Sequence, residues 1–122
     1  MKRLRKREEF AAVYQTGRRV ADRYLVVYAR ENGRSESRVG FAVGRRVGKA
    51  VVRNLVRRRL KEALRVQADE LPGGWDWVLV ARGEAGQASF RELAASALGL
   101  IARATGARVG PGDAGREGRR NA

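Results

Sequence analysis

The chain contains no cysteine and no histidine, and only two of its 122 residues are proline. Without cysteine there is no disulfide framework and no thiolate metal site, and without histidine there is no Ser-His or Cys-His dyad and no imidazole ligand. Acidic residues are also scarce, with 13 Asp and Glu against 27 Lys and Arg and a formal net charge of +14. Hydrolysis by protein-bound metal ions needs several carboxylates that converge on one site, so this composition disfavours it. A polyanionic partner is the first expectation.

Long apolar runs are missing as well. No stretch approaches the ~20 residues that a membrane span requires, and the start of the chain lacks the apolar centre of a signal peptide. We therefore expect a cytoplasmic protein without a membrane partner. The length suits one folded domain, which we place at residues 1–106. Residues 107–122 are basic and rich in glycine with almost no large apolar side chain, and we expect them to form a disordered tail.

The positive charge is concentrated in two segments. Residues 1–23 carry eight Lys and Arg against three acids, and residues 44–65 carry nine against a single acid. Within the second segment Arg53, Arg57 and Lys61 recur every four residues, which places them on one ridge of a helix. Like charges at this spacing repel one another, so the pattern does not stabilise an isolated helix. It favours a surface that binds several phosphates, because ordinary solvated helix faces mix charges of both signs.

Apolar residues at helical spacing predict three helices. The first ends before Gly17, the second covers residues 50–70 without a proline or glycine, and the third runs over residues 89–106. Ser89 and Glu92 suit a capping box at the start of the third helix.

Three segments have strand character, namely residues 21–30, 38–44 and 75–81. The turn residues Asn32 and Gly33 predict a hairpin between the first two segments. Helices and strands together predict an α+β protein in which one mixed sheet packs with helices as an α-β sandwich.

Alternation along the strands separates core from surface. The large residues among 39–43 fall on one face, which we expect to be buried. Trp75 and Trp77 are also expected to pack in the interior. Asp76 between them is expected to face solvent and not to bind a metal.

Aromatic residues near the start of the chain offer a second kind of binding surface. Phe10 and Tyr14 lie one helical turn apart, and residues 24, 26 and 28 (Tyr, Val, Tyr) alternate along a strand. A helix beside that strand would form an aromatic cleft, flanked by Arg7, Arg18 and Arg19. Unpaired RNA binds such clefts because each base that stacks on an aromatic ring contributes ~1 to 3 kcal/mol. The alternative is that these side chains belong to the core.

The basic segment and the strand before it resemble the bacterial ribonuclease P protein subunit. The resemblance rests on residues 38–43 (Arg-Val-Gly-Phe-Ala-Val) and on residues 45–54 (Arg-Arg-Val-Gly-Lys-Ala-Val-Val-Arg-Asn), followed by the basic helix. Residues 10–17 and 78–82 are also similar to that family. The likeness spans roughly residues 4–104 in the family's order.

Two positions depart from the family pattern. Leu55 stands where the family has the second arginine of its Arg-Asn-Arg motif, and Gly44 stands where serine is common. Leu55 cannot supply a phosphate contact, although Arg57, Arg58 and Arg59 keep the helix basic.

The resemblance implies a subunit of the ribonucleoprotein that removes the 5′ leader from precursor tRNA. Its partners would be the catalytic RNA subunit and precursor tRNA, with neither a membrane nor DNA involved. Catalysis would belong to the RNA subunit and its bound Mg²⁺, so the protein would not be catalytic alone. The implied fold has a left-handed βαβ crossover, similar to a domain of a small-subunit ribosomal protein, whereas nearly all such crossovers are right-handed.

The resemblance also suggests which residues bind which RNA. The residues that would face the catalytic RNA are Arg45, Arg46, Lys49, Arg53, Asn54, Arg57, Arg58 and Lys61. The residues that would line the cleft for the 5′ leader are Phe10, Tyr14, Val26, Tyr28, Arg18 and Arg19. No protein residue is expected to be catalytic or to bind a metal.

Three other functions are open to the same sequence. A structural RNA-binding protein of ribosomal type would share the basic helix and the lack of a catalytic set, but it would not need affinity for unpaired RNA at the 5′ side of a tRNA. A membrane-surface protein is disfavoured because the apolar face of the basic helix is needed for the core. An autonomous metal-dependent nuclease would act without RNA and would depend on acids such as Asp22 or Asp76.

Overall fold

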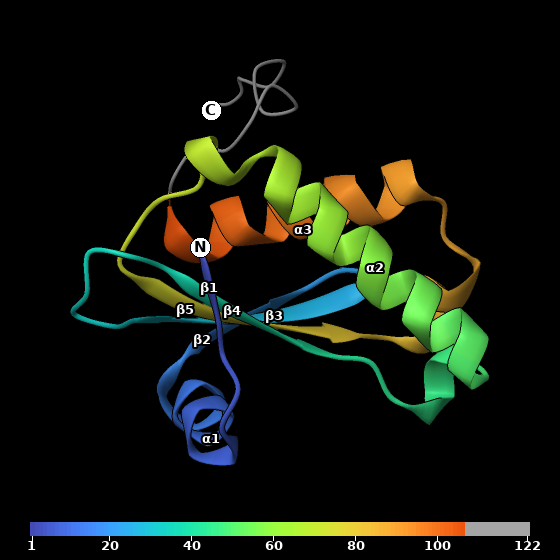
Figure 1. Ribbon diagram of the computed structural model, residues 1–122, viewed down its shortest axis with the longest axis horizontal. Coiled ribbons are helices and arrows are strands. Elements are labelled where there is room, and N and C mark those ends of the chain that lie inside the picture. Colours follow the sequence, from blue (N-terminus) through green and yellow to red (C-terminus); the bar gives the residue numbers. More distant parts are fainter. Residues whose placement is uncertain (107–122) are drawn as a thin grey trace.

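Helices cover both faces of one five-stranded sheet in the computed structural model, which describes residues 1–106 (Figure 1). The predicted tail at 107–122 lies outside the described residues. The helices are α1 (Arg7–Thr16), α2 (Ala50–Val66) and α3 (Phe90–Thr105). The strands are β1 (Lys2–Arg3), β2 (Arg18–Ala21), β3 (Leu25–Glu31), β4 (Arg38–Ala42) and β5 (Trp75–Ala81). Short 3-10 turns occupy Arg45–Val47, Ala68–Glu70 and Gly83–Gln87.

The strands lie in the order β1-β4-β5-β3-β2. Strand β5 runs parallel to β4 and antiparallel to β3, so the predicted hairpin of residues 21–30 with 38–44 is wrong. The apolar run of β5 is buried on both faces, and such a strand requires neighbours on both of its edges. The hairpin instead joins β2 to β3, where Asp22 Oδ1 accepts hydrogen bonds from the backbone N–H groups of Tyr24 (2.9 Å) and Leu25 (3.0 Å).

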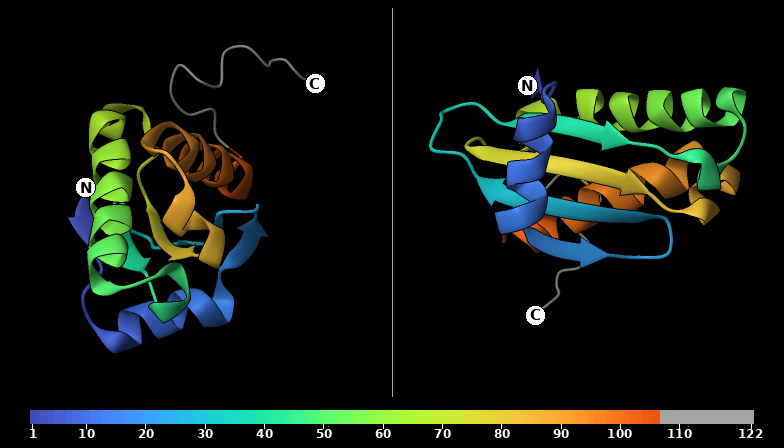
Figure 2. Two further views of the ribbon diagram at one scale, coloured as in Figure 1. Left: turned by 90° about the vertical axis from the view of Figure 1, so that its right-hand side faces the viewer. Right: turned by 90° about the horizontal axis from the view of Figure 1, so that it is seen from below.

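Helix α2 connects two parallel strands, β4 and β5, and forms the predicted βαβ crossover. Seen from the α1 side, both strands run in the same direction with α2 behind the sheet, and the step from β4 to β5 is left-handed (Figure 2, right). The α+β fold with one mixed sheet is thereby confirmed, including the hand that general packing rules would not have suggested.

The main core lies between the sheet and the layer formed by α2 and α3 (Figure 1). Leu60 of α2, Ile101 of α3 and Trp77 of β5 are fully buried in it. The predicted burial of Trp77 is confirmed, and Trp75 and the large residues of 39–43 also pack against this core.

A second, smaller core lies under α1 on the opposite face. It contains Leu4, Val13 and Val78, with Phe10 and Tyr28 among the side chains packed against it. The position of α1 across the sheet is visible in Figure 2.

The helix ends follow the sequence closely. At the start of α3, Ser89 Oγ accepts from the backbone N–H of Glu92 (3.1 Å), and Glu92 Oε1 accepts from that of Ser89 (2.9 Å), which confirms the capping box. Helix α2 ends at Val66, four residues before the predicted end, and a 3-10 turn follows. No helix within residues 1–106 is long and apolar enough to cross a membrane.

Candidate nucleic-acid interface

The basic surface begins at the turn that leads from β4 into α2. Gly48 has φ +149°, and a Cβ there would lie 3.0 Å from Val52, so a glycine is required where the chain enters the helix. Arg45, Arg46 and Lys49 are exposed around this turn.

Helix α2 separates its apolar and basic faces. Val56, Leu60 and Leu64 are buried in the main core, while the predicted RNA-binding residues of the helix are exposed or half-buried on the remaining faces. Arg57 Nη1 donates to Asn54 Oδ1 at 2.9 Å, which links the predicted ridge to a second predicted RNA-binding residue.

Acidic side chains within the described residues neutralise almost none of this charge. Within residues 1–106, the one ion pair formed by α2 joins Arg65 Nη2 to Glu62 Oε2 at 2.6 Å. Arg59 differs from its neighbours, because its Nη1 donates to the carbonyl oxygen of Ala88 at 2.7 Å and thereby ties α2 to the segment before α3. The other cations of α2 have no carboxylate partner in the described part of the chain, so their charge is available to phosphates.

The aromatic residues predicted for the leader cleft meet where α1 packs on β3, and they differ in accessibility. The rings of Tyr14 and Tyr28 meet edge to face with centroids 5.0 Å apart, and Tyr14 is 41% exposed. Phe10 is half-buried, and its ring lies so close to Gly40 that a Cβ there would be 2.5 Å from Phe10 Cζ. Tyr24 packs against the main core instead, because β3 begins at Leu25 and the alternation does not extend to residue 24.

A pocket of about 780 Å³ opens beside this cleft. Val26 and Val80 contribute apolar lining, and Arg19 and Arg46 contribute positive charge. The pocket is therefore lined both by Arg19, which is predicted to bind the 5′ leader, and by Arg46, which is predicted to bind the catalytic RNA. Two further lining arginines, Arg23 and Arg82, were missed by the sequence analysis. For Arg82 the available signals were its position directly after a predicted strand and its place in the segment 78–82 that resembles the family.

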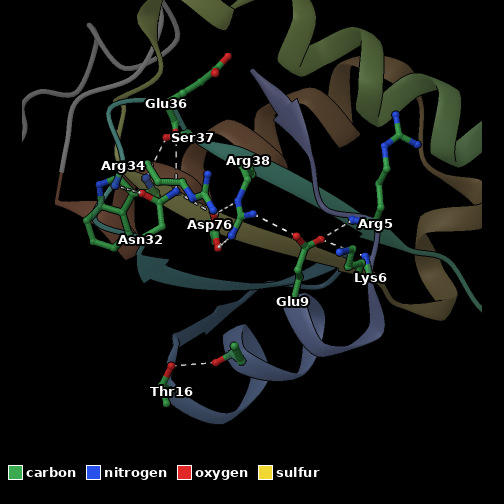
Figure 3. A network of polar contacts seen from close by, with 12 residues as sticks. Arg5, Lys6, Glu9, Thr16, Asn32, Arg34, Glu36, Ser37, Arg38 and Asp76 are labelled. Carbon is green, nitrogen blue, oxygen red and sulfur yellow. Dashed lines mark hydrogen bonds and ion pairs between the residues drawn. The ribbon is translucent and has the colours of Figure 1, made fainter.

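A buried ion-pair network holds the N-terminal end of α1 against the sheet (Figure 3). Arg38 donates to Asp76 through Nε (2.9 Å) and Nη2 (2.7 Å), and its Nη1 donates to Glu9 at 3.2 Å. Asn32 Nδ2 also donates to Asp76 at 2.8 Å. Asp76 is only 1% exposed, so the prediction that it faces solvent is wrong. Its side chain lies on the face that α1 covers, and the alternation of β5 could not reveal that a helix lies there.

The surroundings of these acids favour their charged forms. Burial alone would raise the pKa of Asp76, but hydrogen bonds from Arg38 and Asn32 outweigh it and hold the pKa below its usual value. Hydrogen bonds from the backbone N–H groups of Lys6 and Arg5 likewise lower the pKa of Glu9. Asp76 is therefore held in the charged form that its ion pair with Arg38 requires.

The fold and the charge distribution together define an α+β nucleic-acid-binding protein. The family profile of ribonuclease P matches residues 1–105. The ribonuclease P protein component of Clostridioides difficile is 42% identical over 103 residues, which is 84% of this chain and 90% of that protein. The corresponding protein of Alkaliphilus oremlandii is 38% identical over 99 residues, covering 81% of this chain and 87% of its own length.

Solved structures agree with this result. The RNase P protein from Thermotoga maritima matches with a TM-score of 0.77 at 32% identity, covering 84% of this chain and 97% of that one. The Staphylococcus aureus RNase P protein matches with a TM-score of 0.79 at 28% identity, covering 85% and 95%. The chain belongs to the ribonuclease P protein family. It is a protein component of ribonuclease P, a ribonucleoprotein that processes tRNA.

Proposed function

We propose that this chain binds the catalytic RNA subunit through the surface of α2 and the preceding turn, and binds the 5′ leader of precursor tRNA in the cleft between α1 and β3. The observation that carries this proposal is the pocket that joins Arg19 to Arg46, because it connects the two surfaces on one molecule. A leader that leaves the tRNA could thus follow the cleft while the RNA subunit occupies α2.

Catalysis is assigned to the RNA subunit. Within residues 1–106, no group of three or more acidic side chains could hold a metal ion. Because Mg²⁺ is bound by oxygen ligands and substrate phosphates, we propose that the RNA holds the catalytic Mg²⁺ and that the protein is not catalytic alone. Neutralising phosphates with the α2 cations would lower the Mg²⁺ concentration that the RNA needs. The complex would act in the cytoplasm.

The test is cleavage of a precursor tRNA at low Mg²⁺ by the cognate RNA subunit, with and without the protein, and by the protein alone. We expect efficient cleavage at the mature 5′ end only in the mixture. Cleavage by the protein alone would support an autonomous nuclease. If the protein binds the RNA without accelerating cleavage, a structural RNA-binding role replaces the proposal.

A further inference from the structure

A groove of about 260 Å³ lies between β1 and the C-terminal half of α2, away from the aromatic cleft. Strand β1 lies beside α2 in both views of Figure 2. Apolar side chains and cations both line the groove, among them Val39, Phe41, Arg3, Lys61 and Arg65. No acidic residue is among the lining residues.

The register of β1 directs one of its two cations into this groove. Arg3 pairs with Val39, whose side chain is buried in the main core on the α2 face. Lys2 pairs with Arg38, whose side chain reaches Asp76 and Glu9 on the α1 face. Because paired residues share a face, Arg3 and Lys2 point to opposite sides of the sheet. The guanidinium carbon of Arg3 lies 5.2 Å from the centre of the Phe41 ring.

Two of the cations around the groove, Arg3 and Lys61, repel each other. Partial burial and the charges of Arg3 and Arg57 together lower the pKa of Lys61. Arg65 has a carboxylate partner in Glu62, whereas Arg3 and Lys61 form no ion pair within residues 1–106. A phosphate placed between Arg3 and Lys61 would remove this repulsion.

We propose that this groove binds one unpaired nucleotide of the catalytic RNA subunit, with its phosphate between Arg3 and Lys61 and its base on the apolar surface beside Phe41. An apolar surface ringed by cations matches a nucleotide, which combines a flat base with a charged phosphate. The occupant is the RNA subunit because the groove continues the α2 surface, whereas the aromatic cleft lies on the opposite face of the sheet. The inference rests on the proposed function of α2.

The experiment compares Arg3→Ala with Lys2→Ala, which remove the same charge from neighbouring positions on opposite faces. The affinity of each full-length variant for the RNA subunit is measured over a series of salt concentrations. We expect Arg3→Ala to weaken binding several-fold and to reduce the salt slope by up to about 0.7, the value for one phosphate of a single strand. We expect Lys2→Ala to change both quantities far less. Both residues are exposed, so thermal unfolding should show both variants folded.

Chemical probing of the RNA bases supplies the second measurement. The wild-type protein should protect a single unpaired base that becomes reactive with Arg3→Ala. Equal losses of affinity for the RNA subunit in both variants would show that Arg3 acts through net charge alone, which would overturn the inference. An effect of Arg3→Ala on precursor tRNA alone would overturn the assigned occupant. If Arg53→Ala and Arg58→Ala weaken RNA binding while Arg3→Ala does not, the proposal that the groove binds a nucleotide is overturned and the proposed function of α2 stands.

Discussion

The two faces of the sheet are held by different kinds of interaction. Within residues 1–106, 18 buried residues form one continuous hydrophobic core on the α2 and α3 side, whereas the hydrophobic cluster under α1 contains three. Helix α1 is positioned instead by the ion pairs of Arg38, by the contact of Phe10 with Gly40 and by the edge-to-face rings of Tyr14 and Tyr28. The comparison indicates that one face provides stability while the other places a binding helix. Variants can separate these two roles.

The largest effect is expected from Leu60→Ala in the main core. Leu60 is fully buried, and removing such a side chain leaves a cavity that costs about 2 to 5 kcal/mol of unfolding free energy. Denaturant unfolding measures this loss, with Val13→Ala under α1 as the comparison. A larger loss from Val13→Ala would contradict the assignment of stability to the α2 and α3 face.

The next largest effect is expected from Asp76→Asn, which breaks the ion pair with Arg38. The variant leaves Arg38 with Glu9 as its one acidic partner among residues 1–106, and because losing one member of a buried pair is costly, we expect a loss of about 3 kcal/mol near neutral pH. Because the folded-state pKa of Asp76 lies below its unfolded value, its charge stabilises the fold above about pH 4 and this contribution is lost as the pH falls further. The stability difference between wild type and variant should therefore shrink towards pH 2. A difference that is constant with pH would show that Asp76 stabilises by shape alone.

Asp76 also marks the limit of what the sequence could predict. Helix α2, strand β5 and the capping box at Ser89 follow from local periodicity and capping chemistry, and all three were confirmed. Strand pairing depends on partners far apart in the chain, so the hairpin at Asn32 was placed wrongly and the short strands β1 and β2 were missed. The burial of Asp76 depends on α1 and on Arg38, which are both distant from it in the sequence. The left-handed crossover came only from resemblance to a family.

The candidate site shows the same division. The charge pattern of α2 located the cations in advance, because spacing along a helix fixes which side chains share a face. The cleft aromatics could be named, but not their accessibility: Phe10 packs on Gly40, while Tyr14 remains exposed. Arg23 and Arg82 reach the pocket from separate turns, and only the folded chain brings them together.

Tyr14→Ala should act on substrate recognition and not on stability. Loss of one stacking ring costs about 1 to 3 kcal/mol of binding free energy, which should appear in the binding of precursor tRNA by the holoenzyme and not of mature tRNA. Equilibrium binding of both substrates provides the measurement. Equal losses for the two substrates would show that the cleft does not bind the leader.

Gly40→Ala tests whether the position of α1 controls that same preference. A methyl group at residue 40 would displace the Phe10 ring, and overpacking of this kind costs about 1 to 3 kcal/mol of stability. We expect a loss near the lower end, because the Phe10 ring is half-buried and can shift towards solvent, together with weaker discrimination of precursor from mature tRNA. Affinity for the RNA subunit serves as the control and should be unchanged. A loss of that affinity would mean that the two faces are not independent.

The smallest effect separates Arg58 from its neighbour Arg59. Arg58 is exposed on the proposed RNA surface, so Arg58→Ala should leave stability unchanged and lower the salt slope of RNA binding by less than about 0.9. Arg59 instead donates a hydrogen bond to the Ala88 carbonyl, so Arg59→Ala should cost about 1 kcal/mol of stability with little effect on the slope. Both variants remove one positive charge from adjacent positions of the same helix. If they change the salt slope equally, RNA binding follows the total charge of α2, and no particular face of the helix is directed at the RNA.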